Sequence, residues 1–224
     1  MTRLMCWLQN RPSVGLLSKY YRPSVGLSME KKKTKGESTR ERIIATARRL
    51  FATLGYEGTS TEAVLAESEV SRGALYHHFD NKEALFAAVL EAVEVDLAAA
   101  SARAAAGATD PIAALRAGFA KFLDKAAEPE VRQIVLIDSR VVGWQKWRAI
   151  EEHYGLGDIK RGLNLLVQSG RLRPDKVDIL AHILLAAAME VAFWIARAEN
   201  PTEAAEKGKR EFAEVLERVV GGGR

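Results

Sequence analysis

Helical periodicity runs through this sequence from Ser38 almost to the C-terminus and leaves little room for a β-sheet. Only six prolines occur, and those beyond Pro23 stand at or near positions where a helix can begin. The alternation of apolar and polar residues that marks a strand is missing, apart from an ambiguous apolar run over residues 134–137. The sequence therefore predicts an all-α fold.

Positive charge is concentrated at the N-terminal end of the chain. Residues 1–28 contain four Lys or Arg and no acidic residue, and residues 30–49 contain eight Lys or Arg against three Glu. The whole chain carries only +4, so the remainder is acidic. This asymmetry fits a chain that meets a polyanion at one end, although a solvated basic tail explains it equally well.

The first 28 residues differ in character from the rest. The segment Arg-Pro-Ser-Val-Gly-Leu begins at Arg11 and again at Arg22, and the Pro and Gly of each copy prevent a helix. We hypothesise that the repeat is a translated tandem repeat of DNA and that the natural protein begins at Met29. Residues 1–37 are expected to form a disordered basic tail.

Several classes of protein are disfavoured by simple features of the chain. The most apolar stretch, residues 179–195, is interrupted by His182 and Glu190, so no membrane span is predicted. No signal peptide is recognisable at the N-terminus. Cys6 is the only cysteine, which excludes an intramolecular disulfide and a cysteine-based metal site. These features predict a cytoplasmic protein.

Helix-capping patterns divide the region that follows the tail. A Ser, Thr or Asp three residues before a Glu forms a capping box, and such boxes begin at Ser38, Thr59 and Asp80. Ser71 adds a simple N-cap. The predicted helices run over residues 38–54, 60–67, 72–78 and 81–105. Two short helices joined by so tight a turn form a helix-turn-helix, the arrangement that presents its second helix to DNA.

The helix predicted over 72–78 has a clear inner face. Leu75 and Phe79 lie four residues apart and fill that face, so the consecutive Tyr76, His77 and His78 cannot all be buried. An aromatic residue and two histidines usually serve in packing, but this spacing favours exposure. Because the two histidines lack a third ligand, no metal site is predicted.

The run Ser71-Arg-Gly-Ala-Leu-Tyr-His-His-Phe-Asp-Asn-Lys-Glu-Ala-Leu85 resembles the recognition helix and following helix start of the TetR family of transcriptional regulators. Upstream, Ile43-Ile-x-x-Ala47, Leu50-Phe51 and Gly55-Tyr56-x-x-Thr59-Ser60 match the same family at the same spacing. The resemblance is close over residues 38–90. It implies a DNA-binding domain over 38–85 and a helical effector-binding and dimerisation domain over 86–222.

Two residues depart from the pattern of the family. Glu69 stands in the turn where the family usually has Gly, and Leu65 stands where it usually has Ala. If Glu69 must adopt a left-handed backbone, the cost is about 1 kcal/mol relative to Gly. Both departures can change the pose of the reading helix without removing it.

The resemblance also implies a set of DNA contacts. It places Tyr76, His78 and Lys82 on phosphates, and it places Arg72, Ala74 and His77 nearest the base edges. The chemistry agrees, because an Arg can pair bidentately with guanine and small residues let the backbone approach the bases. The remaining expected contacts come from Gly73 and, at the start of the preceding helix, from Thr59 and Ser60. The lysines at 31–33 and 35 form an arm for the minor groove or a solvated tail.

The second half of the chain is predicted to fold into further helices, over residues 112–126, 130–142, 143–169, 175–198 and 203–220. The 175–198 helix is apolar nearly all round, which suggests that a partner covers one face. The resemblance implies a homodimer in which the last two helices pair with their copies as a four-helix bundle. Two reading heads on a two-fold axis would match a palindromic operator.

The same half is expected to hold a small-molecule effector. Large or adaptable candidates for the pocket are Trp144, Trp147, Tyr154, Met189, Phe193 and Trp194, with His182 and Glu190 as polar groups. Aromatic residues at helical spacing more often form core. Glu190 fits the pocket and the dimer interface equally well, because a buried carboxylate needs a partner.

These observations favour a regulator that binds duplex DNA and is released from its operator by a small molecule. A transcriptional activator and a non-specific DNA-binding protein are the alternatives, although the acidic remainder of the chain argues against DNA coating. An all-helical enzyme is disfavoured, because no catalytic constellation or phosphate-binding loop is present. No cofactor is predicted.

Overall fold

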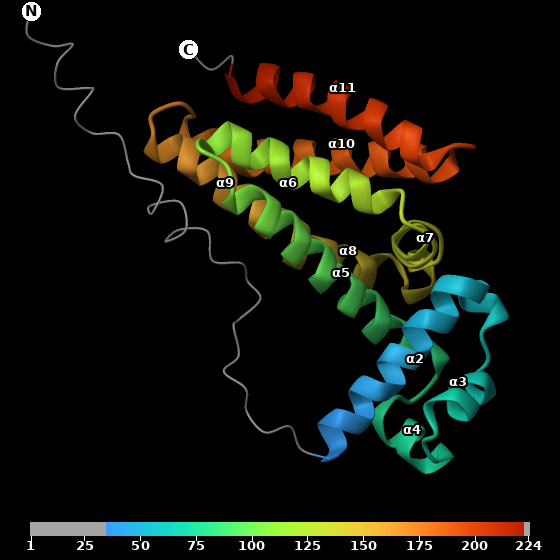
Figure 1. Ribbon diagram of the computed structural model, residues 1–224. Coiled ribbons are helices and arrows are strands. Elements are labelled where there is room, and N and C mark those ends of the chain that lie inside the picture. The colour runs from blue at the N-terminus through green and yellow to red at the C-terminus, as the bar shows by residue number, and fades with distance from the viewer. Residues whose placement is uncertain (1–34, 222–224) are drawn as a thin grey trace, which may run out of the picture.

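The computed structural model describes residues 35–221, which form helices joined by short turns; no strand occurs among them. The expectation of an all-α fold is confirmed. A head of three helices lies at one end of the molecule, and the remaining helices form a larger body (Figure 1). The predicted basic tail, the proposed start at Met29 and the lysines at 31–33 lie outside the described residues.

The head consists of α2 (Lys35–Gly58), α3 (Thr61–Ser68) and α4 (Arg72–His78). The hydroxyl of Ser71 caps α4 as predicted by accepting from the backbone amide of Ala74 at 3.2 Å. In the same way Ser60 caps α3 by accepting from the amide of Ala63 at 3.0 Å. The short helix pair and the tight turn between its members are therefore present as predicted.

Other helix starts differ from the capping boxes in the sequence. Helix α2 already begins at Lys35, so Ser38 lies inside its first turns. Asn81, and not Asp80, caps the next helix, because the Asn81 side chain accepts from the amide of Ala84 at 2.8 Å. At the other end of α2, Gly55 adopts φ 70° and interrupts the helix, which resumes for a final turn.

An aromatic cluster joins the head to the body. Phe51 of α2 packs edge-on against Phe86 of α5 (Lys82–Ala106), with ring centroids 5.0 Å apart. Tyr56 stacks on Phe51 and meets Phe86 at 5.1 Å. Phe51 and Phe86 are fully buried. Since α5 continues from this cluster along the body, the head is attached to the body through one long helix (Figure 1).

The inward residues of the head agree with the sequence pattern in all but one case. Leu75 and Phe79 are buried beneath α4 as predicted. The spacing of Ile43, Leu50 and Leu54 predicts that all three lie on one apolar side of a regular helix. Ile43 and Leu50 are buried on α2, but Leu54, which directly precedes the interruption at Gly55, is 52% exposed.

The body continues with α6 (Pro111–Ala126), α7 (Pro129–Val131), the π-helical turn η1 (Arg132–Ile137), the 3₁₀ turn η2 (Ser139–Val142), α8 (Trp144–Glu151), the π-helical turn η3 (Glu152–Leu156), α9 (Gly157–Gln168), the 3₁₀ turn η4 (Pro174–Lys176), α10 (Val177–Arg197) and α11 (Pro201–Gly221). The predicted helices over 130–142 and 143–169 are thus each divided. The apolar run 134–137 is helical and not a strand; Ile134 and Val135 are buried on it, whereas Ile137 is exposed.

Helices α10 and α11 pack against each other and against α6 on one side of the body. The stretch Pro174–Arg197 is long and apolar enough to cross a membrane by length and composition. A core helix of a folded domain passes the same test. The buried side of α10 packs within the body, and its opposite side carries exposed Ile179, Ile183 and Trp194.

The turn between α3 and α4 contains the strain that the sequence suggested. Glu69 adopts φ 54° and ψ 33°, the left-handed conformation, and is the only non-glycine residue with positive φ in the described part of the chain. Glycine adopts this conformation without a steric penalty.

We predict that Glu69→Gly raises the stability of the protein by about 1 kcal/mol, which corresponds to about 2–4 °C in the melting temperature of a domain this size. Glu69→Ala is the matched control, because it removes the same charge but keeps the steric penalty. Thermal unfolding followed by circular dichroism checks both variants. Equal stabilisation by Gly and Ala would show that the charge and not the backbone is responsible.

Candidate DNA-binding surface and effector cavity

The outer face of α4 carries the residues predicted to read DNA. Arg72, Gly73, Tyr76 and His77 are exposed, while Ala74 and His78 are partly buried. Nothing lies within 4 Å of the position where Gly73 would carry a Cβ, so its backbone is open to a close approach. The structure therefore gathers these six residues around one short helix whose inner face is closed by Leu75 and Phe79.

Arg72 is held by a weak surface contact. Its guanidinium donates to Glu62 of α3 at 3.3 Å, and both side chains are more than 60% exposed. Exposed ion pairs contribute little, because water screens them. Because the contact is weak, the guanidinium of Arg72 can exchange Glu62 for another acceptor.

Lys82 lies beside α4 at the start of α5. Its ammonium nitrogen is 4.1 Å from the centre of the Tyr56 ring, a cation–π distance. Tyr56 belongs to the buried aromatic cluster, and burial raises the pKa of its hydroxyl. Lys82 is therefore positioned by the same packing that attaches the head to the body.

The two residues before α3 differ in what they can offer to a phosphate. Ser60 is exposed, and its oxygen, which caps α3, retains a hydroxyl proton to donate. Thr59 is 1% exposed and donates its hydroxyl proton to the carbonyl of Gly55 at 2.8 Å. Because that donor is buried and already used, we remove Thr59 from the predicted DNA contacts.

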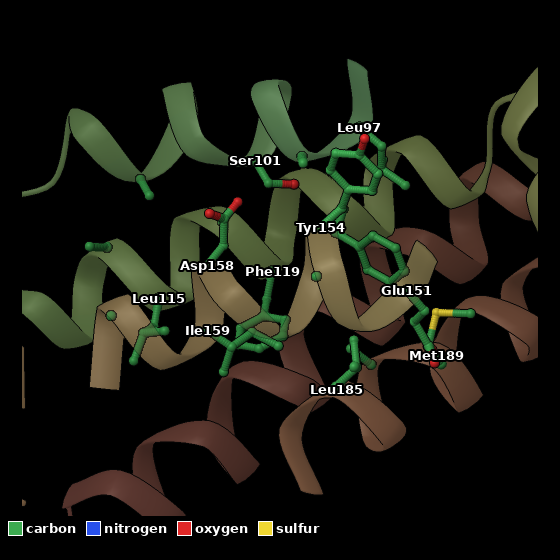
Figure 2. Close-up of a pocket in the computed structure, with 18 of the residues that line it drawn as sticks. Leu97, Ser101, Leu115, Phe119, Glu151, Tyr154, Asp158, Ile159, Leu185 and Met189 are labelled. Atoms are coloured by element: carbon green, nitrogen blue, oxygen red, sulfur yellow. The ribbon is translucent and has the colours of Figure 1, made fainter. Parts of the chain in front are cut away.

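A cavity opens in the body between α5, α6, α9, α10 and the segment α8–η3. The empty space inside it is about 840 Å³ when the open mouth is counted, and about 100 Å³ when only positions for the centre of a water-sized sphere are counted. Figure 2 shows Leu97 and Ser101 of α5 on one side and Leu185 and Met189 of α10 on the other. The walls are largely aliphatic and aromatic.

Two of the eight predicted pocket residues line this cavity, namely Tyr154 and Met189. Trp144 is 69% exposed and packs on Trp147 with ring centroids 5.0 Å apart. Phe193 packs against the core without reaching the cavity. The sequence pattern chose residues on helices that border the cavity, but it could not show which face of each helix lines the cavity.

The polar candidates of α10 also lie elsewhere. His182 lies 3.5 Å from the guanidinium of Arg148, outside the cavity. The Glu190 side chain is 75% exposed beside Arg197, on the same outer face as Trp194. Glu190 therefore does not line this cavity, and its place in a dimer interface stays a prediction.

Three carboxyl groups that the sequence analysis missed line the cavity: Glu94, Glu151 and Asp158. Burial, and next the charge of Glu151, raise the pKa of Glu94 to about 7. Burial also raises the pKa of Glu151, against the opposing effect of Arg148, whose guanidinium donates to it at 2.5 Å. Asp158 is ion-paired with Arg161. The sequence offered no signal for them, since each looks like a surface acid on an amphipathic helix.

An ion-pair cluster spans the junction of head and body. The Arg48 guanidinium of α2 binds both oxygens of Glu130 at 2.7 Å and donates to Asp96 of α5 at 2.5 Å. The hydrogen bond to Glu130 is the largest of the causes that raise the pKa of Arg48. A bidentate pair with two partners fixes direction as well as distance. We call these three residues the Arg48 clamp.

A second contact at the junction involves the kink of α2. Asp138, at the end of η1, accepts from the backbone amide of Tyr56 at 2.7 Å and from the Gln133 side chain at 2.9 Å. A Cβ on Gly55 would lie 3.0 Å from the Gln133 amide nitrogen. Glycine at this kink therefore permits both the positive φ and the close approach of the body.

Comparisons with known proteins agree with this arrangement. Residues 43–89 match the bacterial regulatory proteins of the tetR family, and residues 112–219 match the tetracyclin repressor-like C-terminal domain. A crystal structure of a TetR-family transcriptional regulator from Pectobacterium atrosepticum is 31% identical, with a TM-score of 0.73 over 84% of this chain and 97% of that one.

Two curated relatives extend the comparison. The TetC protein of transposon Tn10 from Escherichia coli is 27% identical over 76% of this chain and 85% of its own length. The regulator UidR of Escherichia coli is 39% identical over 28% of this chain, and the match spans 32% of UidR.

These matches, together with the exposed recognition helix, define a DNA-binding transcriptional regulator. The chain belongs to the TetR family.

We predict that Arg72 of α4 reads the identity of a base, whereas Lys82 at the start of α5 contacts a phosphate. Lys82→Ala should weaken binding to all duplexes alike and lower the salt dependence, because a phosphate contact carries no sequence information. Arg72→Ala should relax the base preference at one position of the half-site, with a loss of about 1–3 kcal/mol on the preferred site. Selection of bound fragments from random duplexes checks both. An unchanged preferred site for Arg72→Ala would contradict the assignment.

We also predict a stability change with pH at Glu94. Its pKa is near 7 in the folded protein against an ordinary 4.5, so ionisation favours the unfolded chain. Stability should therefore fall as pH rises from about 5 to 8, and Glu94→Gln should remove this part of the fall. Melting temperatures at pH 5 and pH 8 check this, with Glu128→Gln, an exposed acid paired with Lys125 outside the cavity, as control. A constant difference between Glu94→Gln and wild type at both pH values would contradict it.

Proposed function

We propose that this regulator is a repressor that a small molecule releases from a palindromic operator. The observation that carries the proposal is the position of α5, which carries Lys82 at the DNA-binding end and Glu94 and Leu97 at the cavity. A ligand that moves α5 also changes the pose of the head. A relative supports repression over activation, since the transcriptional repressor AcnR of Corynebacterium glutamicum is 44% identical over 25% of this chain.

The Arg48 clamp supports a mechanical link between cavity and head. Asp96 of the clamp lies two residues beyond Glu94 on α5, and Glu130 follows α6, which forms another wall of the cavity. A ligand that shifts α5 relative to α7 must therefore shift Arg48 and with it α2. The ligand favours the conformer that it binds more tightly, and operator affinity falls by the same coupling free energy.

We propose that the protein acts as a homodimer through α10 and α11. Both helices expose apolar side chains that nothing in the described part of the chain covers: Ile179, Ile183, Trp194, Val215 and Val219. Two copies of this face would bury it around a two-fold axis and set the spacing of the two heads. The second copy, and not a membrane, then covers the apolar outer face of α10. We expect the protein to act in the cytoplasm, where its DNA lies.

The experiment that tests the function is a gel shift with DNA flanking the gene of this protein. A discrete complex that resists competitor DNA and contains two chains per site is expected. Screening compounds for release of that complex then identifies effectors. A complex no stronger than that with random duplex would overturn the proposal.

We predict that Arg48→Met separates ligand binding from the response. Met keeps an unbranched apolar side chain but removes both ion pairs, so an effector should still bind while operator release becomes at least several-fold weaker. Arg116→Met is the matched control, because the pair of Arg116 with Glu217 lies wholly within the body. Binding by calorimetry and release by gel shift are measured on both. Unchanged release by Arg48→Met would refute the role of the clamp.

A further inference from the structure

The charged groups of the cavity wall are all of one sign. Three carboxyl groups, Glu94, Glu151 and Asp158, reach its lining, while no Lys, Arg or His does. Large apolar side chains from the surrounding helices make up most of the rest, including Leu97, Phe119 and Phe122. Acidic residues are costly in such surroundings, because burial penalises a charge that has no partner.

The three carboxyl groups differ in how they are compensated. Asp158 is ion-paired with Arg161, and Glu151 accepts from Arg148 at 2.5 Å. Glu94 has neither a hydrogen bond nor an ion pair within residues 35–221. A carboxyl group that faces an apolar cavity without a partner has its hydrogen-bonding capacity available to whatever enters the cavity.

Aromatic and hydroxyl groups stand beside this carboxyl. Tyr154 lines the cavity from η3, and its hydroxyl is held by donating to Glu91 at 3.0 Å. Figure 2 shows the Tyr154 ring beside the α5 side chains Leu97 and Ser101, with Glu151 farther along the cavity. An aromatic face attracts a cation, and the hydrogen bond to Glu91 makes the ring of Tyr154 more electron-rich.

From these observations we propose that the effector is an organic cation with a bulky apolar body, whose charge is neutralised by Glu94 with support from Glu151 and Tyr154. The inference rests on the proposed function, since it names the ligand class of the same cavity. An anionic ligand would meet the uncompensated carboxyl group of Glu94, and no Lys, Arg or His of residues 35–221 lines the cavity to receive it. A neutral ligand would leave the desolvated Glu94 uncompensated whenever that group is ionised.

The test compares probes of nearly identical shape and opposite charge. Tetraphenylphosphonium and tetraphenylborate differ in sign, triphenylphosphine oxide is neutral, and benzyltrimethylammonium is a smaller cation. Calorimetry at pH 8 measures the affinity of each for the full-length protein. At least one cation should bind, and the borate and the oxide should bind at least about tenfold more weakly, a difference of about 1.4 kcal/mol. The inference is overturned if neither cation binds, or if the borate or the oxide binds as tightly as the cations.

Two variants test whether the cation binds at Glu94. Glu94→Gln keeps the shape of the side chain and removes the charge, so the affinity of the bound cation should fall at least about tenfold. Glu128→Gln, which removes the same charge from an exposed side chain between α6 and α7 outside the cavity, should leave the affinity within about twofold of wild type. Circular dichroism confirms that both variants are folded. An unchanged affinity in Glu94→Gln would show that the cation binds elsewhere and would overturn the assignment.

Operator release separates this inference from the proposed function. If the cation binds through Glu94 and releases the operator complex, both stand. If the borate or the oxide releases the complex and the cations do not, the protein remains a ligand-responsive regulator, but the inferred class is wrong. If wild-type protein forms no specific DNA complex while Glu94 still governs cation binding, the proposed function fails and the ligand class stands.

Discussion

The packing of Phe86 against Phe51 and Tyr56 is the contact on which the rest of the structure depends. It fixes the three-helix head to the first turns of α5, and α5 then forms one wall of the body. Lys82 is placed by the same ring of Tyr56. The Arg48 clamp and the contact of Asp138 with Tyr56 hold the same junction on either side of this cluster.

The local features of the head could be predicted from the sequence because they depend on near neighbours in the chain. Ser71 caps α4, and Leu75 and Phe79 close its inner face, as the residue types indicate. The left-handed backbone of Glu69 was suggested by the glycine that the family usually has there and not by the glutamate itself. The burial of Thr59 could not be predicted, because its hydroxyl donates to a carbonyl at the kink of α2, and η1 packs closely against that kink.

The cavity could not be predicted in the same way, since it is defined by five segments that lie far apart in the sequence. Periodicity identifies the apolar side of a helix but does not tell a filled interface from a hollow one. Trp144 and Trp194 were therefore chosen for their size, although both are exposed. Glu94 was overlooked because an acid among alanines and valines on α5 resembles an ordinary solvent-facing residue until α6, α8 and α9 surround it.

The left-handed Glu69 has a consequence for the amount of active regulator. A penalty of about 1 kcal/mol corresponds to a factor of about five in the ratio of folded to unfolded protein. Because the head and the body share one buried core, the penalty lowers the stability of the whole folded chain and not of the head alone. One backbone dihedral in the turn before the recognition helix therefore influences how many chains are folded and able to bind DNA.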